Sequence, residues 1–191
     1  MGVEGLSSKE LGKKAKEIKG KKEKLKIGIE INEEMKEVLE SMYEPSYSRL
    51  LPYRVRYLGT SSKDGVPNVN IVSLVQVIDK DKIMMADATF IKTRKNLEEN
   101  PIAALIAEEY RNWDFSEKKM AKVTPPGNLL NITGWQFKGR IELEKEGENY
   151  DIANKMCLER FGPIFMLYAA VILHVDEIYS TVTGQLLQKR S

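Results

Sequence analysis

Four consecutive residues offer the clearest chemistry in this sequence: Lys92, Thr93, Arg94 and Lys95, at the start of a short predicted helix. A helix N-terminus presents unpaired backbone N–H groups and the positive end of the helix dipole. Lys92 and Arg94 would add formal charge there, and Thr93 would add a hydroxyl donor. This combination suits a phosphate group. The residues alone leave a second interpretation open, in which the basic side chains lie on an exposed helix start and face water.

The sequence excludes several other kinds of site. His174 is the one histidine and lies inside a predicted strand, so a histidine-rich metal site cannot form. We expect its ring to be hydrogen-bonded within the sheet. Cys157 is the one cysteine and lies on a predicted helix, which favours inert burial over a reactive thiolate. The chain contains no Gly-x-Gly-x-x-Gly, Walker or Gly-x-Ser-x-Gly motif, so nucleotide-fold and serine-hydrolase interpretations lose support.

The composition predicts one folded domain with a charged arm. A length of 191 residues is typical of a single domain, and a net charge of +2 is too small for a general polyanion binder. Residues 1–30 are rich in lysine and predict a mobile arm, so that 31–191 form the domain. The arm lacks aromatic residues that stack on bases, which disfavours nucleic acid as a partner. No apolar run approaches the ~20 residues of a membrane-spanning helix, and we expect a cytoplasmic protein without membrane contact.

Hydrophobic periodicity predicts a mainly β chain with peripheral helices. Asn32 is the expected N-cap of a first helix, and 92–100 and 148–161 predict two more. Because closing a sheet removes its exposed edges, the predicted antiparallel strands favour a closed or nearly closed barrel. The connection 110–130 is long enough to suit a lid or an interface. The six predicted strands are 53–60, 67–78, 83–87, 102–107, 132–143 and 169–178.

Several segments together resemble one known family. The chain is similar to the pyridoxamine 5′-phosphate oxidase-like, FMN-binding split-barrel family over roughly residues 57–179. The block KTRKNLEENP is the most specific part of the resemblance. The matching segments are LGTSSKDGVPNVNIVS (58–73), IMMAD (83–87), KTRKNLEENPIAAL (92–105), WQFKGRIE (135–142) and AVILHVDEIY (170–179).

The resemblance implies a six-stranded antiparallel split β-barrel, an obligate homodimer and FMN in clefts between the subunits. Lys92 and Thr93 would hold the phosphate, and the strand 70–74 would run along the flavin ring with its backbone at the polar edge. Residues 86–87 would lie near the ribityl chain. The residues implied to bind the cofactor are Asn70, Ile71, Val72, Ser73, Leu74, Ala86, Asp87, Lys92, Thr93, Arg94, Gln136 and Lys138.

The strand that begins at Trp135 is expected to contribute from the partner subunit. Gln136 and Lys138 are its polar candidates, and Lys138 would stabilise the reduced ring. Trp135 and Trp113 could stack on the flavin, although large aromatic residues as often pack in a core or an interface.

The end of the chain departs from the family pattern. True pyridoxamine phosphate oxidases carry a Trp-Arg-Leu type signature near the C-terminus, whereas this chain ends TGQLLQKRS. Vitamin B6 oxidation is therefore not expected. The implied function is an FMN-dependent oxidoreductase acting on an unknown small-molecule or protein electron acceptor. A non-catalytic FMN carrier or store, and a related barrel that binds a deazaflavin or haem, stay open as alternatives.

Overall fold

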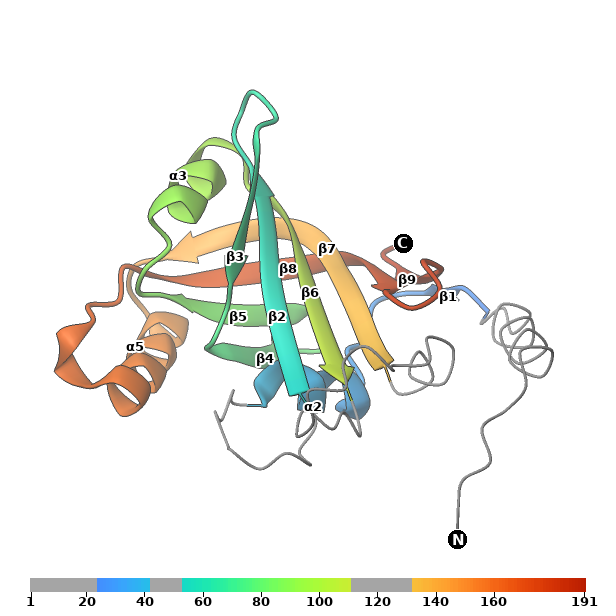
Figure 1. Ribbon diagram of the computed structural model, residues 1–191, viewed down its shortest axis with the longest axis horizontal. Coiled ribbons are helices and arrows are strands. Elements are labelled where there is room, and N and C mark those ends of the chain that lie inside the picture. Colours follow the sequence, from blue (N-terminus) through green and yellow to red (C-terminus); the bar gives the residue numbers. More distant parts are fainter. Residues whose placement is uncertain (1–23, 42–52, 111–131) are drawn as a thin grey trace, which may run out of the picture.

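The structure is a computed structural model that describes residues 24–41, 53–110 and 132–191 (Figure 1). Residues 1–23 of the predicted arm lie outside the described residues, as do 111–130 of the predicted long connection, which include Trp113. The end of the predicted arm is described, and it pairs with the C-terminal strand, where Gly28 N–H donates to Lys189 O at 2.8 Å. Among the described helices, none is long and apolar enough to cross a membrane.

The described helices confirm the predicted ones. They are α2 (Glu33–Glu40), α3 (Ile91–Glu99) and α5 (Glu148–Phe161), and the short 3-10 helix η3 (Gly162–Ile164) follows α5. Helix α2 begins as expected, because the Asn32 side chain accepts the Met35 N–H at 2.9 Å. Its buried residues Met35, Val38 and Leu39 join the barrel core, so α2 covers one end of the barrel.

One sheet contains all the described strands. It follows the order β1-β9-β8-β7-β6-β2-β3, while β4 joins it through β5, which pairs with β8. All neighbours are antiparallel except β1 and β9, so this is an open mixed sheet that stays unpaired between β3 and β4 among the described strands. The strands are β1 (Lys26–Ile27), β2 (Tyr53–Ser61), β3 (Pro67–Ile71), β4 (Val75–Asp79), β5 (Lys82–Asp87), β6 (Ile102–Tyr110), β7 (Ile132–Glu144), β8 (Ala169–Ser180) and β9 (Leu186–Lys189).

The mainly β prediction is confirmed, but the described residues form nine strands rather than six. The predicted strand 67–78 is divided into β3 and β4, because Val72, Ser73 and Leu74 belong to neither strand. Val72 is β-branched and Leu74 is apolar, so the sequence pattern does not indicate this break. The short strands β1 and β9 were not predicted, since neither is long enough to show an alternating pattern.

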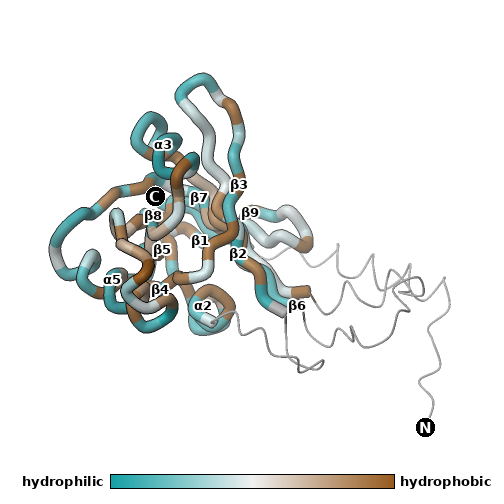
Figure 2. Tube along the Cα trace, turned by 60° about the vertical axis from the view of Figure 1, so that its left-hand side comes forward, coloured by the Kyte–Doolittle hydropathy of each residue, from teal (hydrophilic) through white to brown (hydrophobic). Residues whose placement is uncertain are grey.

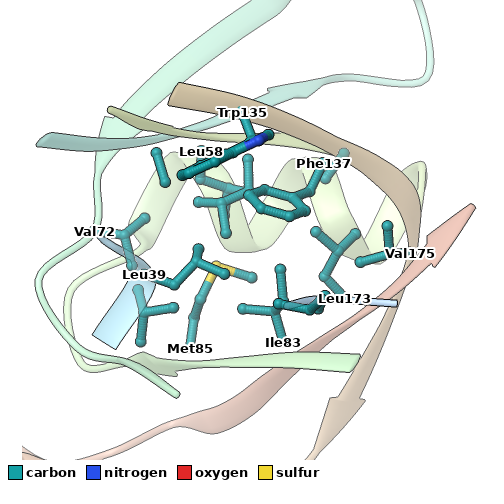
Figure 3. Close-up of a cluster of buried hydrophobic side chains, with 14 of the residues drawn as sticks. Leu39, Leu58, Val72, Ile83, Met85, Trp135, Phe137, Leu173 and Val175 are labelled. Atoms are coloured by element: carbon teal, nitrogen blue, oxygen red, sulfur yellow. The ribbon is translucent and has the colours of Figure 1, made fainter. Parts of the chain in front are cut away.

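Two hydrophobic clusters hold the sheet together. The larger one fills the barrel with residues such as Leu58, Phe137 and Leu173, and includes the ring of Trp135 (Figure 3). The smaller one lies between the sheet and α5 and includes Cys157, which is buried as expected. Burial raises the pKa of the Cys157 thiol by desolvation. Hydrophilic and hydrophobic residues alternate along part of β2 (Figure 2), but its buried residues include Arg56 and Thr60 as well as Leu58, whereas Tyr57 is exposed.

Strand β7 bends where its register with β8 shifts, between Lys138 and Gly139. A Cβ atom at position 139 would collide with the carbonyl group of His174, so only glycine fits there. The bend lets one long strand follow the curved sheet, and it lies beside the outward-facing Lys138.

Candidate cofactor-binding site

The start of α3 is a cationic helix N-terminus, as predicted. The helix begins at Ile91, slightly before the expected start, and its first turn contains no acidic residue. Lys92 is exposed, and it has no ion-pair partner among the described residues. Lys95 instead points along the helix, with its Nζ atom 3.9 Å from Glu99 Oε1. Lys92 is therefore the cation of this turn whose charge is not already paired.

Arg94 is fixed by a buried carboxylate. Asp87 is fully buried at the end of β5 and accepts Arg94 Nε at 2.6 Å and Nη2 at 2.9 Å. The same carboxylate accepts the Phe90 N–H at 2.9 Å, at the N-cap of α3. This hydrogen bonding raises the pKa of Arg94 above its ordinary value. Asp87, predicted to lie near the ribityl chain, thus acts on the site by orienting Arg94 and the helix start.

Tyr168 completes the support of Arg94. The guanidinium carbon of Arg94 lies 3.6 Å from the centroid of the Tyr168 ring, which is cation–π geometry. The Tyr168 hydroxyl accepts from Lys145 Nζ at 2.7 Å and donates to Glu98 Oε1 at 3.1 Å. Arg94 is therefore held on one edge and one face, and its remaining guanidinium N–H donors stay available for an anion.

Thr93 lies deeper than a surface phosphate ligand would require. It is 2% exposed, and its hydroxyl oxygen accepts from Asn68 Nδ2 on β3 at 3.0 Å. The hydroxyl hydrogen is still able to donate. Asn68 and Asn70 are half-buried on the same face of β3, so this strand turns its polar residues toward α3. The structure thereby brings Asn70 to the same end of the sheet as Thr93.

The connector, defined as residues 72–74, joins the other predicted residues to the α3 turn. Ala86 N–H donates to Leu74 O at 3.3 Å, which places the end of β5 beside the connector. Ala86 is followed by Asp87, which holds Arg94. Val72 and Leu74 are buried whereas Ser73 is exposed, so the predicted strand along the flavin is instead an irregular segment with one side chain outward. Most of the predicted residues therefore form one continuous patch.

Gln136 and Lys138 lie elsewhere in the same chain. The cross-strand register aligns Ile71, Tyr57, Ile106, Gln136 and Tyr179 in one row on the outer face of the sheet. Strands β2 and β6 separate these β7 residues from β3 by about 14 Å at the usual strand spacing. Within one subunit, the structure does not bring them to the α3 turn.

The β7 residues have a different environment from the α3 turn. Lys138 Nζ lies 4.2 Å from the centroid of the Tyr179 ring, which keeps the cation on the outer face. Trp135 points the opposite way and is 7% exposed within the barrel core. It is a packing residue rather than a surface on which a flavin could stack.

A known family matches most of this architecture. A family model described as pyridoxamine 5′-phosphate oxidase covers residues 49–181. The chain belongs to this family. The match contains the connector, the α3 turn and the outward residues of β7, so every candidate residue lies inside it. It confirms the resemblance found in the sequence.

The chain is also similar to individual proteins and solved structures. The uncharacterised protein MJ0282 of Methanocaldococcus jannaschii is 28% identical over 158 residues, which are 82% of this chain and 84% of that protein. The crystal structure of HupZ from Group A Streptococcus has a TM-score of 0.56 at 21% identity and covers 82% of this chain and 98% of its own. An FMN-binding protein from Syntrophomonas wolfei has a TM-score of 0.51 at 18% identity and covers 91% and 95%. At these identities the two structures establish the fold alone.

Three residues of the site were missed by sequence analysis: Asn68, Tyr168 and Arg56. Asn68 and Tyr168 reach the α3 turn only through strand pairing and the fold of the segment before β8. Arg56 is 3% exposed, although the alternation of arginines with Val55 and Tyr57 along β2 predicts that the arginines face solvent. The fold turns the arginine face of β2 inward, so the sequence pattern could not have found Arg56.

Proposed function

We propose that this protein binds FMN between the subunits of a homodimer and transfers electrons between small molecules. The observation that carries the proposal is the cationic start of α3, where Lys92 is unpaired and Arg94 is pre-oriented. A flavin mononucleotide has a phosphate at one end and a polar ring edge at the other. The α3 turn offers partners for the phosphate, and the connector offers partners for the ring edge.

The phosphate end fits the charge distribution of the α3 turn. Asp87 cancels much of the charge of Arg94, so the net positive charge there comes mainly from Lys92 and from the helix N-terminus. Arg94 contributes directed donors, which suit the geometry of a phosphate, while Lys92 contributes an unpaired charge. The turn holds the phosphate, and the buried Thr93 hydroxyl is positioned at its base.

The ring end fits the connector and the end of β5. Backbone N–H groups of the connector can donate to carbonyl oxygens at the polar edge of the flavin, and apolar Ala86 borders them. A bound flavin supplies hydride and single-electron transfer. The protein orients the ring and adjusts the charge around it, and Lys138 of a partner subunit is our candidate for a cation near the reduced ring.

A second copy of the chain is the proposed cover for the outer face. Val69 and Ile71 are each 67% exposed, whereas Asn68 and Asn70 of the same strand turn inward. This inversion of the usual pattern leaves an apolar surface next to Tyr57 and Ile102, which are 37% and 48% exposed. Exposed apolar surface of this kind commonly marks an interface. Pairing two such faces also offers a way to bring Gln136 and Lys138 to the partner's flavin.

Optical spectroscopy tests the cofactor. The purified protein, or its apo form mixed with FMN, should show a flavin spectrum, and the released chromophore should be identified as FMN. A deazaflavin or haem spectrum without FMN uptake would replace the proposed cofactor. Stopped-flow mixing with NADH or NADPH then separates an oxidoreductase from a carrier, because an oxidoreductase should bleach its flavin within turnover while a carrier should be indifferent to both donors.

Dilution tests the shared site. Because the proposed cleft contains residues of two subunits, dilution below the dimer dissociation constant should release the flavin. An Ile71→Asp variant should sediment as a monomer and lose flavin, whereas Val182→Asp, at another exposed apolar residue in the turn before β9, should do neither. A monomeric protein that holds FMN tightly would contradict the shared cleft.

A further inference from the structure

A buried arginine lies directly behind the connector. Arg56 is 3% exposed, and its guanidinium donates only to backbone carbonyls: Nε to Val72 O at 3.3 Å, Nη2 to Ser73 O at 3.4 Å, and Nη1 to Leu39 O at 2.7 Å. Nη1 also donates to Ser41 O. Among the described residues, no carboxylate pairs with it.

The contrast with Arg54 shows that this arrangement is unusual. Arg54 lies two positions earlier on the same face of β2 and pairs with Glu37 at 2.7 Å and with buried Glu109 at 3.1 Å. Burying a charge is costly unless an opposite charge compensates it, and apolar replacements of similar size often stabilise a core. Burial, reinforced by the nearby charge of Arg54, lowers the pKa of Arg56 to about 10, so the side chain is still cationic at neutral pH. The C-terminal end of the α2 dipole gives only partial compensation.

The arginine determines the orientation of two peptide groups. In a planar trans peptide the C=O and the following N–H point in opposite directions. Because the carbonyls of Val72 and Ser73 both point at Arg56, the N–H groups of Ser73 and Leu74 both point away from it. In an extended strand, successive carbonyls would alternate in direction, so this arrangement explains why the predicted strand breaks here.

The two N–H groups form a small site for an oxygen atom. Within the described residues, neither the Ser73 N–H nor the Leu74 N–H has a hydrogen-bond acceptor, although Leu74 is 7% exposed. Successive N–H groups with a common direction make a concavity that binds anionic or carbonyl oxygen. Hydrogen bonds from a cation to the carbonyls polarise the same peptides and make their N–H groups stronger donors. Ser73 and Leu74 line part of a cavity of about 130 Å³, so this part of the connector is not fully covered.

We propose that Arg56 is a positioning residue that aims the Ser73 and Leu74 N–H groups at a carbonyl oxygen of the isoalloxazine ring and favours the reduced, anionic ring by its buried charge. The inference rests on the proposed flavin site and deepens it. It assigns ring recognition to a side chain that does not itself touch the flavin, and it separates ring recognition from phosphate recognition at the α3 turn.

The test compares Arg56→Lys and Arg56→Met with Arg54→Lys as the matched control. Arg56→Lys keeps the charge but cannot hold both connector carbonyls in the same fork, so affinity should fall by about tenfold for riboflavin and for FMN alike. Arg56→Met should in addition lower the affinity for reduced flavin more than that for oxidised flavin, seen as a more negative midpoint potential. Arg54→Lys should lower stability while flavin affinity and potential stay within about twofold of wild type.

Four outcomes are informative. The inference is supported if both Arg56 variants lose ring affinity and Arg56→Met also shifts the potential. It is overturned if folded Arg56→Lys, the milder variant, binds both flavins as tightly as Arg54→Lys with an unchanged potential, because Arg56 would then act only on stability. If Arg56→Met fails to fold, the Arg56→Lys comparison decides alone. A wild-type protein that takes up no flavin would instead overturn the proposed function itself.

Discussion

Arg94 and Arg56 are both held rigidly beside the candidate site, but by opposite kinds of partner. Arg94 pairs with the buried carboxylate of Asp87, which cancels charge and fixes direction. Arg56 pairs with carbonyls alone, which fix direction and leave its charge in place. A cation that binds a phosphate directly needs well-oriented N–H donors. A cation behind a neutral ring instead stabilises negative charge on that ring through its electrostatic field. The partner of a rigidly held arginine therefore indicates what the arginine does.

The largest effect should follow from removing the carboxylate that pairs with Arg94. Asp87→Asn leaves the guanidinium without its carboxylate, and we expect the free energy of unfolding to fall by about 2–3 kcal/mol, less than for a fully buried pair because Arg94 is partly exposed. FMN affinity should fall with it. Urea denaturation and flavin titration measure both quantities.

The control for that variant is Asp176→Asn. Asp176 also pairs with an arginine, Arg190, but both side chains are about half exposed, at 50% and 44%. Its loss should change the free energy of unfolding by well under about 1 kcal/mol. Equal destabilisation by the two variants, with FMN affinity unchanged in both, would show that the Asp87–Arg94 pair has no special role.

A smaller effect should follow from removing the Tyr168 ring that supports Arg94. Tyr168→Leu removes the ring beneath the guanidinium and should weaken FMN binding by about twofold to fivefold, as expected for a partly exposed cation–π contact. Tyr168→Phe keeps the ring and loses only exposed hydrogen bonds to Lys145 and Glu98, so it should bind FMN like wild type. Isothermal titration of both variants checks this. Equal losses in the two would assign the effect to the hydroxyl.

The smallest expected effect concerns the chain's one histidine. His174 Nε2 on β8 lies 2.9 Å from Glu142 Oε2 on β7, so the ring is hydrogen-bonded in the sheet as predicted. His174→Ala should leave FMN affinity within about twofold of wild type, because no charge-assisted contact to the flavin is lost. If the variant instead lost a bound haem, the cofactor would be haem and neither arginine would have the role assigned to it.

Much of the fold was accessible from the sequence because it depends on local patterns. Asn32 signals the start of α2, alternation reveals the long strands, and Pro101 marks the end of α3. The cationic turn at Lys92 is likewise local. Each of these features requires only residues within a few positions of one another.

The remaining features depend on contacts between distant segments. The stacking of Tyr168 on Arg94 requires the ends of β5 and β8 to lie side by side, where the Tyr168 N–H donates to Asp87 O at 2.8 Å. The connector carbonyl of Val72 accepts a hydrogen bond from Arg56 on β2, a contact that no pattern within the predicted strand could reveal. Whether Gln136 and Lys138 act in the site stays a prediction, because it depends on a second subunit.

A comparison of FMN with riboflavin tests the central claim most directly, because the two flavins differ only in the phosphate. If the turn at Lys92 holds that phosphate, the wild-type protein should prefer FMN strongly, and Lys92→Ala should reduce this preference by about tenfold to a hundredfold while riboflavin affinity stays unchanged. Lys95→Ala, which removes a lysine that already faces Glu99, is the matched control and should keep the preference. An identical preference for FMN in wild type and Lys92→Ala would contradict the account.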